Sequence, residues 1–170
     1  GLVHVGVPIL GVRLEVGPVD RDGDGLRETA AGMQSPAPRL EVVDLSSQAR
    51  VQALGLSLGD EPIGALINNA GLLCEALHIT EDGFELTFAV NTMAPFLLTH
   101  LLWPQLVASG DGRVVNVVSL SYRHGRIDFD DLPGTRDFQR YGAYARSKLA
   151  LLLLTRELAR RAGQQPVAVN

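Results

Sequence analysis

The chain has 170 residues, of which 46% are hydrophobic and 20% are charged, and its formal net charge at pH 7 is -4. This length and composition suit one domain with a sizeable core. The acidic balance excludes the basic surface of nucleic-acid-binding proteins, so no nucleic-acid partner is expected. No apolar run reaches the roughly 18 residues of a membrane span, and the single cysteine, Cys74, cannot form an internal disulfide. We therefore expect a cytoplasmic protein without a membrane span.

Short apolar runs alternate with helical patterns along the chain. Strands are predicted at 12–16, 39–45, 64–68, 113–119 and 166–170, and helices at 27–33, 46–58, 81–108 with breaks, and 144–162. Nearly continuous apolar strands separated by helices are typical of a parallel sheet covered on both faces. The sequence therefore predicts an α/β fold, a doubly wound parallel sheet in a single domain over residues 1–170. Residues 122–140 form a polar loop within it.

Polar or small residues follow three of the predicted strands. Asp44, residues 68–71 (Asn-Asn-Ala-Gly) and Ser119 each lie at or just past a strand's end. Ligands of parallel sheets bind beyond the carboxyl ends of the strands. Helix capping explains any one of these positions, but explains all three less easily. The pattern favours a ligand crevice along this edge of the sheet.

Lys148 is the only lysine of the chain, and the other fourteen of its fifteen cationic side chains are arginines. A position that stays lysine against such a bias suits a compact ammonium on a flexible stem, which arginine does not supply. One lysine among fifteen cations also arises by chance. The count alone therefore does not make Lys148 a functional residue.

Two tyrosines precede this lysine in the segment YGAYARSK, residues 141–148. Tyr144 lies four residues before Lys148, so on a helix the two side chains share one face, with about 6 Å of rise between them. Tyr141 is about 10 Å away along the axis and is expected to precede the helix. An ammonium favours the phenolate form of a nearby tyrosine, which suits proton transfer to a carbonyl or from an alcohol. Taken alone, Tyr-x-x-x-Lys is a weak signal, because chance and ordinary buried helices also produce it.

Four segments in order point to one protein family. They are LINNAG (66–71), VNTMAPFLLTHLL (90–102), GRVVNVVSLSYRHGRIDFDDL (112–132) and YARSKLALLLLTRELARR (144–161). Together they resemble the short-chain dehydrogenases/reductases, and within them the retinol-dehydrogenase-like branch, from about residue 11 to residue 170. The resemblance implies a Rossmann-like NAD(P)-binding domain. It also implies an oxidoreductase that interconverts an alcohol and its carbonyl compound by hydride transfer.

The resemblance also implies a role for each matching residue. Tyr144 is the expected acid/base, and Lys148 is expected to bind the nicotinamide ribose and to favour ionised Tyr144. Ser119 is expected to hydrogen-bond the substrate oxygen, with Ser121 as the less favoured alternative. Asn91 is expected to hold the backbone and a water that relays protons to the lysine. The residues expected at the cofactor are Asp44 and Leu45 at the adenine, then Asn68, Ala70 and Gly71, together with Tyr144 and Lys148.

The chain departs from the family at both ends. The turn Thr-Gly-x-x-x-Gly-x-Gly, which brings the backbone to the cofactor pyrophosphate, is absent, because Gly1, Gly6 and Gly11 have the wrong spacing. Residues 1–10 are atypical, and residues 166–170 match the strand before the family's substrate-covering helices. We therefore expect a Rossmann-like domain that is incomplete at both ends. Weak or no dinucleotide binding is expected of the chain as it stands.

The cofactor and the partners follow from the same resemblance. Asp20 favours NAD and the adjacent Arg21 favours NADP, so both cofactors stay open, with NADP favoured because the branch often uses it. The expected substrate is a small alcohol or carbonyl compound. In the family, the helices that carry Asn91 and Tyr144 pack against a twin subunit, so a homodimer through these helices is expected.

Other functions fit the sequence less well. Ser119 lacks the glycines of the Gly-x-Ser-x-Gly elbow of serine hydrolases, and the four histidines are too scattered for a metal site. A sugar-nucleotide epimerase shares Tyr-x-x-x-Lys, but is not expected to combine it with the Asn-Asn-Ala-Gly turn. The alternative that stays open is a catalytically inactive fragment or scaffold. Such a chain would keep the helices for association without binding a cofactor.

Overall fold

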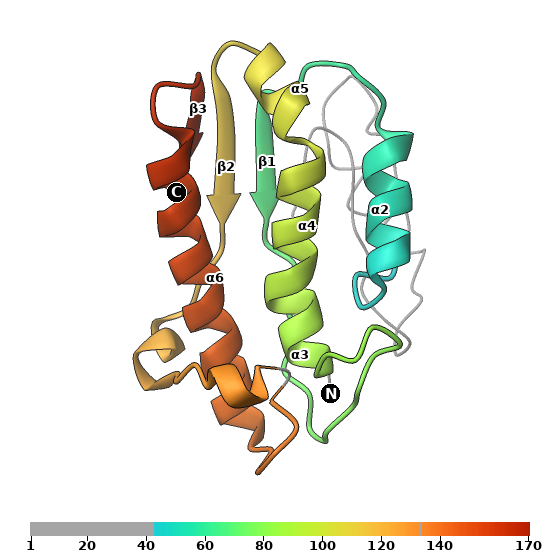
Figure 1. The fold of residues 1–170 in the computed structure, drawn as a ribbon, viewed down its shortest axis with the longest axis vertical. Helices are drawn as coiled ribbons and strands as arrows, with labels where there is room; N and C mark the ends of the chain where they lie inside the picture. The colour runs from blue at the N-terminus through green and yellow to red at the C-terminus, as the bar shows by residue number, and fades with distance from the viewer. Residues whose placement is uncertain (1–42, 133) are drawn as a thin grey trace, which may run out of the picture.

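The computed structural model describes residues 43–132 and 134–170, which form a three-stranded parallel sheet with helices packed in front of it (Figure 1). The strands β1 (Ala65–Asn68), β2 (Gly112–Asn116) and β3 (Val167–Val169) are ordered β1-β2-β3. In their register, Asn68 pairs with Asn116 and Val114 with Val169. The predicted parallel sheet is confirmed for these three strands. The elements predicted at 12–16 and 27–33 lie outside the described residues, as does most of the strand predicted at 39–45, whose described residues 43–45 are not in a strand.

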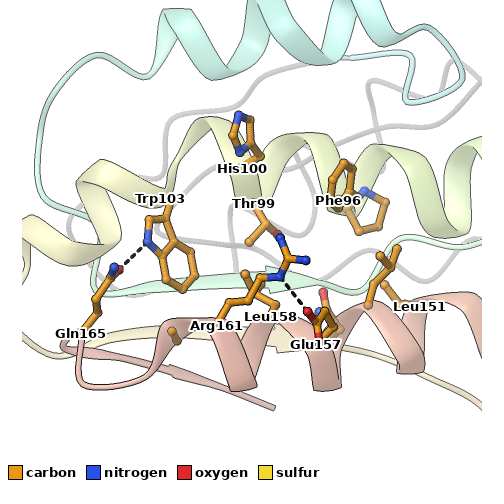
Figure 2. A pocket seen from close by; sticks show the side chains of 13 residues that line it. Phe96, Thr99, His100, Trp103, Leu151, Glu157, Leu158, Arg161 and Gln165 are labelled. Carbon is orange, nitrogen blue, oxygen red and sulfur yellow. Dashed lines mark hydrogen bonds and ion pairs between the residues drawn. The ribbon is translucent and has the colours of Figure 1, made fainter.

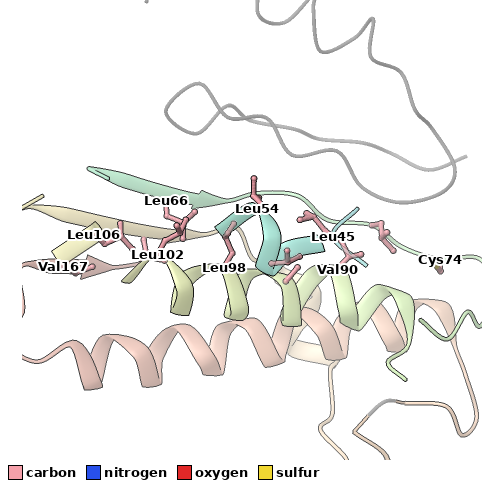
Figure 3. Close-up of a cluster of buried hydrophobic side chains, with 13 residues drawn as sticks. Leu45, Leu54, Leu66, Cys74, Val90, Leu98, Leu102, Leu106 and Val167 are labelled. Atoms are coloured by element: carbon pink, nitrogen blue, oxygen red, sulfur yellow. The ribbon is translucent and has the colours of Figure 1, made fainter. Parts of the chain in front are cut away.

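Helices connect the strands. The elements in chain order are α2 (Gln48–Ser57), α3 (Leu86–Phe88), the π-helical turn η1 (Ala89–Met93), α4 (Ala94–Leu101), α5 (Trp103–Ala108), the 3-10 turns η2 (Leu120–His124) and η3 (Phe129–Asp131), and α6 (Arg140–Ala162). Helices α4 and α6 lie on one side of the sheet (Figure 3), and α2 lies beside α4, beyond the β1 edge of the sheet (Figure 1). None of the described helices is long and apolar enough to cross a membrane.

The hydrophobic core fills the space between the sheet and α4 (Figure 3). Leu66 of β1, Val114 of β2 and Val167 of β3 are buried there. They belong to one cluster with Leu98 of α4 and Leu102, the residue that follows this helix. Burying a side chain of this kind contributes about 1.5–3 kcal/mol. This packing seats α4 on the sheet.

A chain of buried hydrogen bonds crosses the molecule from α4 to α6. Asn68 Nδ2 donates to Thr99 Oγ1 (3.1 Å) in α4 and to Asn116 Oδ1 (2.8 Å) in β2. Asn116 Nδ2 donates to Thr155 Oγ1 (2.9 Å) in α6, and the Thr155 hydroxyl donates to the carbonyl oxygen of Leu151 (2.7 Å). Buried amide groups of this kind are costly unless they are paired. The network therefore fixes the positions of α4 and α6 relative to the carboxyl ends of β1 and β2.

The predicted start of the helical segment 81–108 is wrong, because helix begins only at Leu86. Gly83 has a φ of 81°, a left-handed conformation that ends the preceding turn. The carboxylate of Glu85 then caps the helix by accepting from the N–H groups of Thr87 (2.7 Å) and Phe88 (3.1 Å). A capping residue stands outside the helix that it caps.

Two further boundaries differ from the predictions. The strand predicted to reach residue 119 ends at Asn116, opposite the end of β1, so Ser119 follows the strand by three residues. The helix predicted from Tyr144 begins at Arg140, and the extended Gln139 accepts its first hydrogen bond, from the N–H of Ala143 (2.8 Å). Tyr141 therefore lies inside α6 rather than before it. Its seven-residue separation from Lys148 is unaffected.

We predict that Gly112→Ala lowers the free energy of unfolding by about 2 kcal/mol. A Cβ on Gly112, the first residue of β2, would lie 2.4 Å from the carbonyl oxygen of Leu106 in α5, so the strand or the helix would have to move. Gly64 is the matched control, because apart from its two chain neighbours no described residue has an atom within 4 Å of a Cβ built there. Gly64→Ala should change the stability by about 1 kcal/mol or less. Chemical denaturation measures both, and equal stabilities would contradict the packing.

Candidate active site

The carboxyl ends of β1 and β2 lie side by side. After β1 ends at Asn68, the chain continues through Asn69 and Ala70 to Gly71, and after β2 ends at Asn116 it continues through Val117. The N–H of Val117 still donates to the carbonyl oxygen of Asn68 (3.0 Å). The two segments therefore leave the sheet together, at the edge where the sequence predicts a crevice.

Lys148 reaches this edge from α6. Its Nζ donates to the carbonyl oxygen of Val117 (2.8 Å). A Cβ added to Gly71 would lie 3.3 Å from this Nζ and 3.4 Å from Asn91 Oδ1, so the three residues are neighbours and the glycine leaves them room. Lys148 is only 4% exposed, and burial lowers its pKa to about 8. The structure thus brings Gly71, Asn91 and Lys148 to one point.

Asn91 lies in the π-helical turn η1 and is fully buried. Its Oδ1 accepts from the N–H of Leu72 (2.8 Å), and its Nδ2 donates to the carbonyl oxygen of Leu72 (2.9 Å) and to Ser147 Oγ (3.0 Å). Single π-helical turns are rare and frequently occur at functional sites. Asn91 joins the segment after β1 to α6, and both of its amide hydrogens are used within the chain.

The two tyrosines of α6 differ in their surroundings. Tyr144 is half-buried one turn before Lys148, and the lysine Nζ is 5.8 Å from the centroid of its ring. Tyr141 is 66% exposed, and its hydroxyl accepts from Arg140 Nη2 (2.6 Å). The Arg140 guanidinium also lies over the Tyr141 ring, 4.4 Å from its centroid. Tyr144 is therefore the tyrosine beside Lys148.

Ser119 caps the 3-10 turn η2, and its Oγ accepts from the N–H of Ser121 (3.3 Å). Gly125, just after this turn, packs against α6, because a Cβ there would lie 2.5 Å from the carbonyl oxygen of Ala145. Such a close approach requires a glycine. The segment from Ser119 to Gly125 is thus held beside the helical turn that carries Tyr144.

The other residues predicted at the cofactor are engaged within the protein. Asp44 Oδ1 accepts from the N–H (2.9 Å) and the hydroxyl (2.6 Å) of Ser46, and Leu45 is buried in the core. Asn68 uses both amide hydrogens in the network described above, and Ala70 packs against the core. Their cofactor role stays a prediction.

A family model described as short chain dehydrogenase matches residues 14–170. The chain belongs to the short-chain dehydrogenase family. Its relatives include retinol dehydrogenase 13 from Homo sapiens, 43% identical over 131 residues that cover 75% of this chain and 40% of that protein. Retinol dehydrogenase 14 from Homo sapiens is 45% identical over 130 residues, 75% of this chain and 39% of that protein. Polyprenol dehydrogenase from Mus musculus is 43% identical over 141 residues, 76% of this chain and 41% of that protein.

Solved structures agree with this family. A protein from Mycobacterium paratuberculosis superposes with a TM-score of 0.73 and 36% identity, over 87% of this chain and 55% of that one. RhlG from Pseudomonas aeruginosa, solved as an active-site complex with NADP, superposes with a TM-score of 0.67 and 26% identity, over 92% of this chain and 59% of that one. This short-chain dehydrogenase chain spans about 40% of the length of the curated relatives it matches.

Sequence reasoning missed Ser147, which lies between Tyr144 and Lys148 of this short-chain dehydrogenase. Ser147 is fully buried, and its Oγ donates to the carbonyl oxygen of Tyr144 (2.7 Å) while accepting from Asn91. Its own carbonyl oxygen accepts from Thr92 Oγ1 (2.9 Å). In the sequence, a serine inside a helix looks the same whether it faces solvent or a second helix. Its position directly before the lysine was the only available signal.

A buried ion pair lies beside Ser147. Nη2 of Arg146 is 3.8 Å from Oε2 of Glu85, the fully buried carboxylate that caps α3. The Arg146 guanidinium also lies over the ring of Phe88, 5.9 Å from its centroid. Gly134 packs so closely on this guanidinium that a Cβ there would collide with it. The pair holds the start of α6 against α3 and against the loop after η3.

A groove of about 650 Å³ lies between α4 and α6, and Tyr144, Lys148 and Ser119 are not among the residues that line it. Figure 2 shows Phe96 facing Leu151 across this groove. A hydrogen bond from Trp103 Nε1 to Gln165 Oε1 (2.7 Å) closes one end. The groove is therefore separate from the Lys148 site.

We predict that the lysine NMR titration of the folded chain has its midpoint near pH 8, and that it returns to about 10.5 in urea. Lys148 is the only lysine, so the signal needs no further assignment. Folding releases a proton between these two pH values, because the unfolded chain binds more protons there. The contribution of Lys148 to the free energy of unfolding should therefore rise with pH from about 8 to about 10.5.

The control for this titration is Lys148→Met, a neutral side chain of similar length. It should abolish the rise in stability over that pH range. A folded-state midpoint near the ordinary lysine value would show that the ammonium is not buried.

Proposed function

We propose that the protein that carries this sequence, a short-chain dehydrogenase, interconverts an alcohol and its carbonyl compound, with NADP or NAD as the hydride carrier. One observation carries the proposal, the position of the buried Lys148 ammonium. It lies 5.8 Å from the ring of Tyr144 and next to Gly71 and Asn91, at the carboxyl ends of two parallel strands. A phenol beside a buried cation at this edge suits proton exchange with a substrate oxygen.

Tyr144 carries the proton that is transferred. When a carbonyl compound is reduced, its phenolic O–H donates to the substrate oxygen, and when an alcohol is oxidised, the phenolate accepts the alcohol proton. Lys148 stays mostly protonated at neutral pH, because its pKa of about 8 lies above that pH. Its ammonium therefore offsets negative charge that develops on the phenolic oxygen.

Ser119 holds the substrate oxygen in this proposal. A hydroxyl has one hydrogen to donate and two lone pairs that accept. One lone pair of Ser119 Oγ is taken by the N–H of Ser121, so its hydrogen is left for a substrate. Ser121 is the less favoured donor, and its buried Oγ has no hydrogen-bond partner among the described residues.

The residues at the strand ends fit the nicotinamide ribose. Gly71 leaves open the space that a Cβ would fill beside Lys148 Nζ, and the ammonium is a donor that ribose hydroxyls accept. Asp44 and Leu45, shortly before α2, are proposed at the adenine. When bound, the cofactor accepts or supplies the hydride. NADP is favoured because RhlG, a structural relative, was solved with NADP.

The names of the sequence relatives suggest the substrate to test first. Retinol dehydrogenases and a polyprenol dehydrogenase are named for alcohols, so we propose an apolar alcohol or its carbonyl compound. Leu120, the residue directly after Ser119, is an exposed apolar side chain (72%). An apolar group next to the proposed substrate donor supports an apolar substrate.

Cytoplasmic localisation remains a proposal. Cys74 is a free, buried thiol, and burial raises its pKa, which keeps it unreactive. A thiol that forms no disulfide suits a reducing compartment. Imaging the tagged protein in its own cells tests this directly.

We predict that Tyr144→Phe lowers turnover of an apolar alcohol about 100-fold or more in the protein that carries this sequence. The change removes only the hydroxyl that exchanges the proton. Tyr141→Phe is the matched control on the same helix, and its turnover should equal that of the unaltered protein. Steady-state kinetics with NADP and retinol provide the measurement, and full activity of the Tyr144 variant would overturn the proposed acid/base.

Titration with NADPH distinguishes this proposal from an inactive scaffold. For the 170-residue chain alone we expect weak or no binding, because its sequence lacks the glycine-rich turn. Micromolar binding, followed by NADPH fluorescence, would overturn this expectation and favour the enzyme over the scaffold. A longer protein that carries these residues and also fails to bind NADPH would favour the scaffold.

We also propose a homodimer through α4 and α6. The groove between these helices is largely apolar, and Phe96 of α4 is 50% exposed at it. Leu153 of α6 is 48% exposed and adds to the apolar surface of that helix. The family resemblance points to the same two helices. A second copy of the chain is the occupant that these observations favour.

We predict that Phe96→Asp converts this dimer to a monomer, because it places a charge in the apolar contact. Leu56→Asp is the matched control, since Leu56 is an exposed leucine (73%) on α2. Sedimentation velocity at several concentrations measures both variants. A monomeric unaltered protein, or a dimer that survives Phe96→Asp, would rule out this interface.

A further inference from the structure

We propose that Ser147 is a positioning residue for Tyr144 and Lys148, and that it acts by hydrogen-bonding α6 to Asn91. Ser147 itself touches neither a substrate nor a cofactor in this proposal. The catalytic task of the pair rests on the proposed function, whereas the positioning is a property of the folded chain alone.

The hydroxyl of Ser147 both donates and accepts a hydrogen bond within the protein. It donates to the carbonyl oxygen of Tyr144 (2.7 Å) and accepts from Nδ2 of Asn91 (3.0 Å), in a position with no solvent exposure. In an α-helix the carbonyl of residue 144 also accepts from the N–H of residue 148. The carbonyl oxygen of Tyr144 therefore accepts hydrogen bonds from the side chain of Ser147 and from the backbone of Lys148, which links the proposed acid/base to its lysine.

The far end of this connection is fixed as well. Asn91 binds Leu72 through both the N–H (2.8 Å) and the carbonyl oxygen (2.9 Å) of that residue. Leu72 directly follows Gly71, whose Cα faces Lys148 Nζ. The hydrogen bonds thus form a continuous route from the segment after β1, through Asn91 and Ser147, to the backbone of Tyr144.

Removing the hydroxyl disturbs the surroundings of the lysine. Without Ser147 Oγ, one buried hydrogen of Asn91 Nδ2 has no acceptor, and such a group is costly until it turns or binds water. Asn91 Oδ1 lies against the same Gly71 position as Lys148 Nζ. Water that enters there would hydrate the ammonium, whose burial is what now disfavours its charged form.

Thr92 provides a matched comparison. Its hydroxyl also bonds to Ser147, but to the main-chain carbonyl oxygen (2.9 Å), which has a helical N–H partner of its own. Thr92 is equally buried, and valine has nearly its shape. Thr92→Val therefore removes one buried hydrogen bond to the same residue and leaves the route through Asn91 intact.

The test is the NMR titration of the single lysine in the full chain, measured without cofactor for Ser147→Ala and Thr92→Val. We expect Ser147→Ala to raise the lysine midpoint by about one pH unit or more. Thr92→Val should leave the midpoint unchanged, although both variants lose thermal stability. A folded Ser147→Ala chain with an unchanged midpoint, or an equal shift in both variants, would overturn the proposal.

A second variant covers a failure of Ser147→Ala to fold. Ser147→Cys keeps the size of the side chain but offers a weaker acceptor, so its midpoint should shift in the same direction by less. An unchanged midpoint in the folded cysteine variant would also overturn the positioning role. Since no cofactor or substrate enters these measurements, their outcome is independent of whether the chain oxidises an alcohol.

Discussion

The hydrogen bond from Asn68 to Asn116 (2.8 Å) joins the last residues of two parallel strands, and the rest of the site depends on the register that it marks. Adjacent residues of a strand face opposite sides, so a slip by one residue would turn either amide away from its partner. Gly71 and Val117 follow these strand ends and are the groups that Lys148 meets. The same two amides also bind Thr99 and Thr155, which fixes α4 and α6 relative to the sheet. The hydrogen bonds of Asn68 and Asn116 thus fix the strand register, the positions of α4 and α6, and the surroundings of Lys148 together.

Helix α6 is held in its position against the site by polar contacts as well as by apolar packing. Ser147 binds Asn91, Arg146 pairs with the buried Glu85, and Lys148 binds the carbonyl oxygen of Val117. Each buried polar group is costly when unpaired and specific when paired. Three consecutive residues of one helix therefore face three different segments of the chain. Such a helix tolerates little rotation, which is what the proposed proton transfer by Tyr144 requires.

The sequence predicted the fold and the neighbourhood of the site better than it predicted the boundaries of the helices and strands. The strand end at residue 68 follows from an apolar run, whereas the predicted end at residue 119 lies three residues beyond Asn116, where β2 ends. The four-residue spacing selects Tyr144 over Tyr141 because it depends only on helix geometry. The start of α3 depends on the capping carboxylate of Glu85, and glutamate is common inside helices as well. The role of Ser147 depends on its hydrogen bond with Asn91, which lies 56 positions away in the sequence. Contacts of that range leave no local pattern, so only the structure reveals them.

The π-helical turn at Ala89–Met93 has a consequence for the length of this helix. Such a turn contains one residue more than the α-helical turn it replaces. Deleting any one residue within it would restore a regular helix, and every earlier side chain would rotate by about 100° about the axis. Asn91 and the cap of α3 would then no longer face Leu72 and α6 together. A one-residue deletion in this stretch would therefore disrupt the arrangement around Asn91 even where Asn91 itself is retained.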